Sequence, residues 1–418
     1  MKLMNAKGVR DFPPEKKIVR QQITDTLREV FELYGFSPLE TPVLERFDVL
    51  ASKFTGGEEI LKETFRLSDQ GERDLALRYD LTVPLCRFVA MNPTVKLPFK
   101  RYQMERVFRD GPLKKGRYRE FWQCDADVVG SKGVAAEAEL INLAIDAFKK
   151  LNLNIVVKVN NRKILNSIVD YAGIKEKDAD SVILSVDKLE KIGKKGVEEE
   201  LTKKGIKREQ AEKLFEILAF KGTFNEKIEL LSEKLKEKEG VAEIQELFSY
   251  LNTCCNVNFD LTLARGLAYY TGTVYEVFLE DSDITSSVAA GGRYDNMIGN
   301  LIGGNKEYPA VGISFGLDVL TDAIECDEKR KSVADVFIIP IGTLKESLKV
   351  ASILRKKGIR TDIDVNNKNI SKNLNYINAQ GIPYAAFIGE EENRLGKIKL
   401  KNMKTGEESL IEPDKVKL

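Results

Sequence analysis

The 418-residue sequence contains no histidine, and this absence removes several kinds of chemistry at once. Without imidazole there is no histidine general base, no His-ligated metal and no Ser–His or Cys–His nucleophile pair. Any catalysis must therefore use arginine, carboxylates, tyrosine or glutamine, with Mg²⁺ as an optional aid.

Cysteine and long apolar runs are also scarce. The five cysteines are odd in number and include no Cys-x-x-Cys pair, which argues against a disulfide framework and against structural zinc. No apolar run approaches the length that spans a membrane, and the N-terminus lacks the apolar region of a secretory signal. We therefore expect a reduced, cytoplasmic protein with no membrane partner.

The sequence also lacks an excess of either positive or negative charge. Lysine and arginine number 66 and aspartate and glutamate 65, so the net charge is +1 and no global basic field points to nucleic acid. Any RNA contact must use local patches, such as Lys114, Lys115, Arg117 and Arg119. Hydrophobic residues make up 43%, enough for sizeable cores, and the length predicts about two to four domains.

The region from Arg101 to Gly130 reads as a strand, a basic loop and a second strand. In the second strand Trp122, Cys124, Ala126 and Val128 alternate with Phe121, Gln123, Asp125 and Asp127. Because period two places alternate residues on opposite sides of a sheet, one set faces the core. The other side collects Arg109, Phe121, Gln123 and Asp127 around a possible pocket. An ordinary hairpin with a solvated outer face remains the alternative.

A second segment, from Leu263 to Val277, sets Arg265 beside Tyr269 and Tyr270 in a glycine-broken turn that leads into a β-branched, aromatic strand. A fixed cation beside two phenols suits an anion together with a polar aromatic ring, and turns carry function more often than strands do. A surface stack of arginine on tyrosine is the alternative interpretation.

Apolar spacing predicts the remaining organisation. We expect a helix over 14–35 that ends at Gly35, an extended segment over 36–47 interrupted by Pro42, a helix over 134–151 and a strand over 155–159. From about 160 to 250 charged residues alternate with leucine and isoleucine without sheet signals, which predicts helices. From 332 onward strands and helices alternate and a hairpin follows, which predicts a small α/β domain with a mainly parallel centre.

Five segments, in order along nearly the whole chain, resemble the histidyl-tRNA synthetases of the class II aminoacyl-tRNA synthetases. Arg109 followed by Gly116-Arg-Tyr-Arg-Glu-Phe-x-Gln123 resembles motif 2 of that class. The run from Leu263 to Glu276 resembles the signature peptide of the family. The shorter matches are the family's amino-terminal start at Lys7 to Pro13, its amino-acid-binding turn at Leu77 to Pro84 in the archaeal and eukaryotic form, and its late glycine turn at Ala290 to Asp295.

The resemblance implies an α+β fold. Residues 1–325 would form an antiparallel-sheet catalytic domain with a helical insertion at about 172–250, and residues 332–418 an α/β anticodon-binding domain. It also implies that ATP activates histidine to histidyl-adenylate, which is then transferred to the 3′ end of histidine tRNA, with Mg²⁺ as cofactor. A homodimer through the Pro42 segment and contact between the insertion and the tRNA acceptor arm are further implications.

Carried over position by position, the resemblance assigns roles to individual residues. Arg109 and Arg265 would be catalytic, holding the α-phosphate from opposite sides. The residues implied to bind histidine are Asp80, Leu81, Thr82, Arg109, Gln123, Asp127, Arg265, Tyr269 and Tyr270. Those implied to bind ATP are Arg109, Arg117, Phe121, Arg265 and Gly316. No residue is assigned as a metal ligand.

The sequence also departs from the family pattern. The motif 3 segment runs from Gly312 to Val319, and Val319 stands where an ATP-contacting arginine is usual. Arg293 is a candidate to compensate, and Ala268 replaces an acidic residue in the signature peptide. These departures keep an alternative open: a paralogue that does not aminoacylate, resembling the regulatory subunit of ATP phosphoribosyltransferase. Such paralogues normally lack the C-terminal domain and the signature arginine and tyrosines, which this chain retains.

Overall fold

The computed structural model describes residues 3–52, 61–113, 117–251, 256–265, 269–303, 307–324 and 330–418. The chain forms two compact units. The first comprises Met1–Arg10 with Ile23–Ala323, and the second comprises Asp11–Gln22 with Ile324–Leu418. Among the described residues, no helix is both long enough and apolar enough to cross a lipid bilayer.

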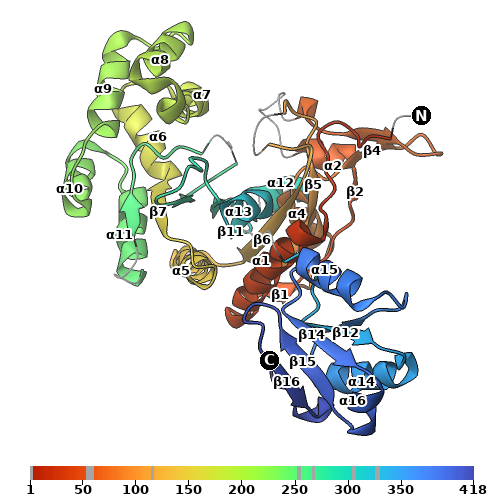
Figure 1. Ribbon diagram of the computed structural model, residues 1–418. Helices are drawn as coiled ribbons and strands as arrows, with labels where there is room; N and C mark the ends of the chain where they lie inside the picture. Colours follow the sequence, from red (N-terminus) through yellow and green to blue (C-terminus); the bar gives the residue numbers. More distant parts are fainter. Residues whose placement is uncertain are drawn as a thin grey trace. The chain divides into compact units, whose positions relative to one another are not determined.

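An eight-stranded sheet organises the first unit (Figure 1), in the order β1-β5-β6-β11-β10-β9-β7-β8. Neighbouring strands run antiparallel except β1 beside β5 and β8 beside β7. The bounds in sheet order are Ser37–Pro38, Phe99–Phe108, Glu120–Val129, Ala310–Gly316, Ala289–Arg293, Thr273–Leu279, Ile155–Asn161 and Val257–Phe259. The antiparallel catalytic sheet expected from the sequence is confirmed.

The hairpin of β5 and β6 has the alternation that the sequence predicts. Gln103 pairs with Asp125 and Glu105 with Gln123, so the odd-numbered residues of both strands share one face. On the other face Cys124 and Ala126 are fully buried in the core. The register therefore turns a row of polar side chains on β6 toward one side of the sheet.

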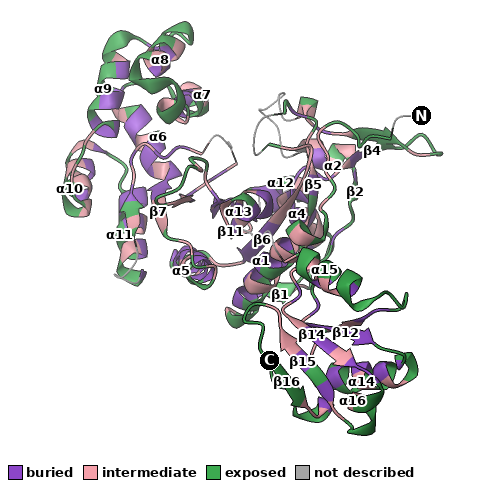
Figure 2. Cartoon of the chain, viewed as in Figure 1, coloured by how far each residue is buried: buried purple, intermediate pink, exposed green. Residues whose placement is uncertain are grey.

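Two helices cover the core face of the sheet. They are α1 (Pro14–Leu33), which ends before Gly35 as expected, and α5 (Ala135–Lys150). The ring of Phe315 on β11 lies 5.6 Å from that of Phe31 on α1 and 5.7 Å from that of Phe148 on α5. Figure 2 shows that buried residues are abundant in β6, β11 and α5. This packing fixes β6 and β11 side by side.

Further elements surround the sheet. The sequence did not predict the small antiparallel sheet β2-β4-β3. Its strands are Leu44–Arg46, Asp74–Leu77 and Arg66–Ser68, and the nearby helices are α2 (Phe47–Ser52), α4 (Thr82–Met91), α12 (Met297–Ile302) and α13 (Leu317–Ala323). The turn between β4 and α4 brings Asp80 to the end of a helix.

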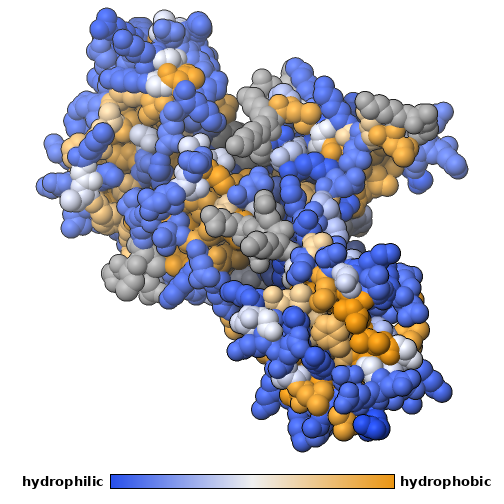
Figure 3. All heavy atoms as spheres, in the orientation of Figure 1, coloured by the Kyte–Doolittle hydropathy of each residue, from blue (hydrophilic) through white to orange (hydrophobic). Residues whose placement is uncertain are grey.

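The elements between residues 162 and 250 are helices, as the charged alternation predicts. They are α6 (Arg162–Tyr171), α7 (Glu176–Val186), α8 (Leu189–Lys203), α9 (Arg208–Leu218), α10 (Phe224–Lys234) and α11 (Glu239–Tyr250). A capping box of Thr223 and Glu226 starts α10. In Figure 3 the outer ends of these helices, at the top of the view, carry mainly hydrophilic residues, as expected for solvated helix faces.

The second unit contains a five-stranded sheet in the order β13-β12-β14-β15-β16. Its first three strands are parallel and the last two antiparallel. The strands are Thr361–Ile363, Val336–Pro340, Tyr384–Ile388, Ile398–Asn402 and Glu408–Ile411, accompanied by α14 (Leu344–Lys356), α15 (Ile370–Gln380), α16 (Glu390–Arg394) and the 3₁₀ helix η1 (Pro413–Lys415). The α/β unit with a parallel centre is confirmed, although the short α16 was not expected.

Candidate active site

A pocket of about 290 Å³ lies on the polar face of the central sheet, close to the lower end of the usual size range for small-molecule sites. Strands β6, β10 and β11 form its floor, and the turn before α4 and the segment before β9 form its walls. Of the residues that the sequence singles out, those lining it are Asp80, Thr82, Arg109, Phe121, Gln123, Asp127, Arg265, Tyr269, Tyr270 and Gly316. Segments more than 200 residues apart in the chain, such as those of Asp80 and Gly316, thus meet at one site.

Two candidate residues are not among those lining the pocket. The side chain of Leu81 is fully buried, and its carbonyl accepts a hydrogen bond of 3.2 Å from Arg101 Nη2. Arg117 is about half-exposed and lies 3.5 Å from Glu63. Lys114, Lys115 and Ala268 lie outside the described residues.

The two candidate catalytic arginines line the same pocket but are held differently. The guanidinium of Arg109 lies between two rings, 4.3 Å from the centre of Tyr79 and 4.9 Å from that of Phe121. Arg265 donates to Glu276 on β9 over 2.5 Å and lies 5.9 Å from the ring of Tyr270. The two arginines share no partner among these contacts, so each guanidinium is held at the pocket by its own set of residues.

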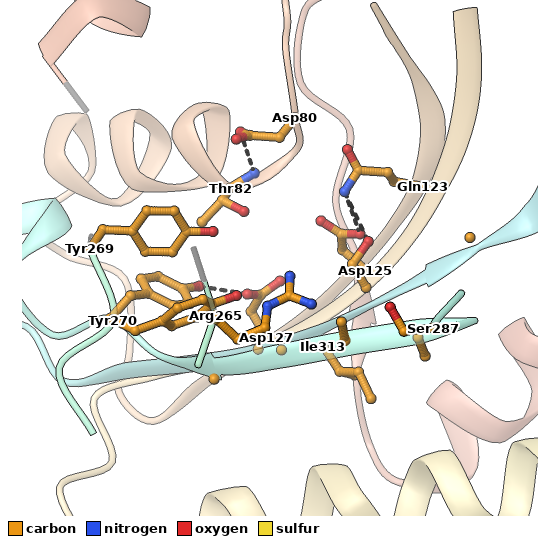
Figure 4. Close-up of a pocket in the computed structure, with 18 of the residues that line it drawn as sticks. Asp80, Thr82, Gln123, Asp125, Asp127, Arg265, Tyr269, Tyr270, Ser287 and Ile313 are labelled. Atoms are coloured by element: carbon orange, nitrogen blue, oxygen red, sulfur yellow. Dashed lines mark hydrogen bonds between the residues drawn. The ribbon is translucent and has the colours of Figure 1, made fainter. Parts of the chain in front are cut away.

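Figure 4 shows how the polar side chains surround the cavity. Tyr269, Tyr270 and Arg265 project into it from one side, whereas Gln123 and Asp125 lie on the opposite side. The two tyrosine rings are 4.6 Å apart. The Asp80 carboxylate accepts from the amides of Thr82 and Val83 at 3.1 and 3.0 Å, which fixes the turn at the start of α4.

Asp127 is held rigidly by its neighbours. Its Oδ1 accepts a hydrogen bond of 2.5 Å from the Tyr294 hydroxyl, and its Oδ2 lies 2.8 Å from Nη2 of the fully buried Arg101. Burial, followed by the Asp127 charge, raises the pKa of Tyr294 well above its ordinary value, so the phenol stays a donor. On the adjacent strand, a side chain at Gly312 would collide with this carboxylate.

Sequence reasoning missed several residues that line the pocket: Tyr79, Asp125, Ser287, Ile313, Ser314, Tyr294 and the glycines 291, 292 and 312. Asp125 shares the parity of Gln123 and Asp127, so the alternation alone could have identified it. The residues from β10 and β11 carry no such local signal. They reach the site because these strands lie beside β6 in the sheet.

The motif 3 segment comprises the end of β11 and the start of α13. Val319 in this segment replaces the usual arginine, but Arg10 pairs with the neighbouring Asp318. Arg10 Nη2 lies 2.5 Å from Asp318 Oδ1, and the Arg10 guanidinium stacks 3.3 Å from the centre of the Tyr118 ring. The other Asp318 oxygen accepts from the Trp122 amide at 3.0 Å. A guanidinium from the amino-terminal segment is therefore held one residue away from Val319.

Arg293 does not compensate for Val319. Its side chain is buried and binds both oxygens of Glu137 on α5, at 2.6 and 2.7 Å. It also donates to the carbonyls of Ser131 and Gly133. Because Arg293 is committed to these partners and does not line the pocket, it braces β10 against α5 instead.

The described residues offer no protein cage for a metal. No group of three or more acidic or cysteine side chains that could hold a metal ion occurs among them. Mg²⁺ commonly binds through substrate phosphates and water with few protein ligands.

The arrangement can bring two anions together and recognise a small polar cation. Two arginines face a cavity that also holds the carboxylates of Asp80, Asp125 and Asp127. An antiparallel sheet that carries such a pocket, joined to a separate α/β unit, is the architecture of the class II aminoacyl-tRNA synthetases.

Comparison with known proteins narrows this class. A family model described as histidyl-tRNA synthetase matches residues 8–320, and one described as an anticodon-binding domain matches residues 335–417. The chain therefore belongs to the histidyl-tRNA synthetase family. A protein of Bacillus cereus named histidine–tRNA ligase 1 is 46% identical over 421 residues, covering 98% of this chain and 95% of its own length. The histidine–tRNA ligase of Phocaeicola vulgatus is 38% identical, with 98% and 97% covered.

Solved structures of similar proteins have the same fold. The crystal structure of histidyl-tRNA synthetase from Nostoc sp. PCC 7120 has a TM-score of 0.87 at 31% identity, covering 99% of this chain and 98% of that one. A Bacillus halodurans structure, titled as an ATP phosphoribosyltransferase regulatory subunit/histidyl-tRNA synthetase, has a TM-score of 0.75 at 23% identity and shows the fold alone. It covers 93% of this chain and 98% of its own. All these relatives are bacterial, so they do not support the archaeal or eukaryotic likeness expected from Leu77 to Pro84.

Proposed function

We propose that this chain is a histidine–tRNA ligase, which uses ATP to form histidyl-adenylate and then transfers histidine to its tRNA. The observation that carries the proposal is the meeting of Arg109 and Arg265 in one pocket with paired tyrosines and buried carboxylates. Membership of the ligase family and the similarity to the Bacillus cereus ligase over nearly its whole length support the same activity. The paralogue alternative is not favoured, because the chain has both the pocket arginines and the C-terminal unit.

The first step joins two anions, the carboxylate of histidine and the α-phosphate of ATP. Charge neutralisation and in-line positioning are therefore the main demands, and no protein base is needed. We assign Arg109 to the α-phosphate and the substrate carboxylate, and Arg265 to the same phosphate from the other side. The pairing of Arg265 with Glu276 orients its guanidinium before the substrate arrives.

Selecting histidine requires groups that read both ring nitrogens. We assign Asp127 to accept from one N–H and Tyr270, beside Tyr269, to bond to the other. The contacts of Asp127 with Arg101 and Tyr294 hold that carboxylate in place. The α-ammonium is assigned to Asp80, Thr82 and Gln123, with Leu81 positioning the turn that carries Asp80 and Thr82.

For ATP, the pocket offers an aromatic ring and a glycine on the neighbouring strands β6 and β11. We assign Phe121 to stack on adenine and Gly316 to give the nucleotide close access to β11. Arg117, outside the pocket lining, is assigned to the outer phosphates. Mg²⁺ neutralises phosphate charge when bound, and we expect it on the phosphates and water because the described residues form no cage for it.

The units are assigned separate tasks. We propose that residues 1–325 carry out activation and transfer, that the helical region 172–250 touches the acceptor arm and that residues 332–418 bind the anticodon. The match of an anticodon-binding family model to residues 335–417 supports the last assignment. The homodimer through the Pro42 segment and the cytoplasmic location stay predictions.

Histidine-dependent exchange of pyrophosphate into ATP tests the proposal directly. The enzyme should exchange with histidine and not with the other nineteen amino acids, because buried polar partners reject substrates that lack matching groups. A charging assay with histidine tRNA then tests transfer. A silent exchange assay, with the protein folded, would favour the non-aminoacylating paralogue.

A further inference from the structure

Asp125 is the pocket carboxylate that has no role in the assignments above. It lies on β6 between Gln123 and Asp127 and is 3% exposed, yet it lines the cavity (Figure 4). The groups that face it come from four segments: Arg101 on β5, Gln123 and Asp127 on β6, Ser314 on β11 and Asp80 in the turn before α4. A buried carboxylate at a cavity wall needs a partner, because burying an unpaired charge is costly.

Asp125 and Asp127 differ in how far protein groups already satisfy them. Asp127 has a short hydrogen bond on one oxygen and an arginine on the other, at 2.5 and 2.8 Å. Asp125 accepts from Gln123 Nε2 over 3.5 Å, near the limit for a hydrogen bond, and contacts the Ser314 hydroxyl. A carboxylate has about four acceptor positions, so Asp125 retains capacity for a donor from the cavity.

The charge balance indicates what kind of donor fits. The charged neighbours of Asp125 are Arg101, Asp127 and Asp80, whereas Arg109 lies between the rings of Tyr79 and Phe121 and Arg265 is paired with Glu276. Burial, opposed by Arg101 and reinforced by Asp127 and Asp80, raises the pKa of Asp125 to about 7. A neutral ligand would leave this excess of carboxylates uncompensated, whereas an ammonium group would balance it.

We propose that Asp125 binds the α-ammonium group of the amino-acid substrate and releases its own proton to solvent when that cation binds. The inference deepens the proposed function and rests on it. Gln123 places the contact at the ammonium, because it lies beside Asp125 and is already assigned to that group. No bond other than the O–H of Asp125 changes, and the proton passes to buffer.

Three ligands distinguish recognition of the α-ammonium group from recognition of the imidazole ring. Histidine carries both groups, histidinol keeps the amine and ring but lacks the carboxylate, and imidazolepropionate lacks the amine. Asp125→Asn should weaken histidine and histidinol about tenfold to hundredfold, the range of a lost charge-assisted bond. The binding of imidazolepropionate should not change. An equal loss for all three ligands, or no loss for any, would overturn the proposal.

The number of protons released on histidine binding gives a second readout. Substitution of Asp125 would not change this number if the role of Asp125 were purely structural. Near pH 7 the empty wild-type pocket holds Asp125 partly protonated, so histidine binding should release protons from this carboxylate. Calorimetry in buffers of different ionisation enthalpy measures that number. The Asn variant should lose this release while keeping any contribution of the ligand's own imidazole. Identical release in the two proteins would contradict the proposal.

The pH dependence has a definite sign. A raised pKa means that the ionised, ammonium-binding form is gained as pH rises through about 7. Histidine affinity of the wild type should therefore increase across that range, and that of Asp125→Asn should increase less. Asp125→Glu keeps a titrating carboxylate, so it should retain proton release even with a weaker affinity, and its loss of release would count against the proposal.

A control variant and the wild-type protein distinguish failure of the Asp125 proposal from failure of the proposed function. Asp170→Asn removes an exposed carboxylate on α6, 3.9 Å from Lys236, and should match the wild type in every measurement. Wild-type exchange activity tests the proposed function by itself. A wild type that exchanges pyrophosphate while the Asn variant binds all three ligands normally would refute only the role of Asp125.

Discussion

Gly312 leaves no room for a side chain, and replacing it by alanine tests how Asp127 is held. An ideal Cβ at this position would lie 1.8 Å from Asp127 Oδ1, whereas ordinary contact begins near 3.4 Å. The carboxylate would have to retreat by about 1.6 Å. That movement would break its contacts with Tyr294 at 2.5 Å and Arg101 at 2.8 Å.

The energetic consequence follows from the burial of the partner. Arg101 is fully buried, and separating a buried ion pair costs about 3–5 kcal/mol. Gly312→Ala should therefore lower the free energy of unfolding by about that amount, a large share of the usual stability of about 5–15 kcal/mol. Histidine should bind at least about tenfold more weakly, because the misplaced carboxylate no longer meets the ring.

Urea denaturation and calorimetric titration with histidine measure the two effects. Gly316→Ala, at the end of the same strand, is the matched control for stability. Its added methyl would meet Val288 O at 3.7 Å and Val319 Cγ2 at 3.8 Å, which are ordinary contacts. We expect its stability to stay within about 1 kcal/mol of the wild type.

A double substitution shows whether the collision is the cause. Because Asp127→Ala removes the colliding atoms, adding it to Gly312→Ala should cost much less than the sum of the two single effects. Wild-type stability and histidine affinity in Gly312→Ala would refute the reasoning. So would strictly additive losses in the double variant.

Three other substitutions probe the same pocket. Arg265→Ala should lower the exchange rate far more than histidine affinity, because its partner charge develops at the phosphate; unchanged exchange kinetics would refute that role. Tyr270→Phe should weaken selection for histidine about tenfold, the effect of one lost hydrogen bond, and an ATP-specific defect would mean the pocket is misassigned. Arg10→Ala should raise KM for ATP, and Val319→Arg in that background should restore it, since each places a guanidinium beside motif 3; an unaltered KM for ATP in Arg10→Ala would exclude this.

Local periodicity predicted the parts of the site that lie on one hairpin. Alternation along β6 placed Phe121, Gln123 and Asp127 on one face, and the register of β5 and β6 confirms it. Asp125 has the same parity, but it was not assigned to the pocket because the family resemblance offered it no role. The C-terminal α/β unit was likewise predicted because its elements pair mostly with neighbours in sequence.

Contacts between distant segments could not be predicted. Arg293 reaches Glu137 across 156 residues, and Arg10 reaches Asp318 across 308. Both depend on which strands and helices become neighbours in space, and side-chain spacing does not encode that. Arg293 was considered for the nucleotide because its sequence position suggested a turn, whereas burial beside α5 gives it a bracing role.

Trp122 is the only tryptophan in the chain, and its position makes it a built-in optical probe. It follows Phe121 on β6, is half-buried, and its amide is tied to Asp318. Intrinsic tryptophan fluorescence therefore arises, without any label, from a single indole on β6, next in sequence to Phe121 of the pocket lining. Because this indole belongs to the first unit, its emission reports the melting of that unit alone. Calorimetry records the melting of the second unit for comparison.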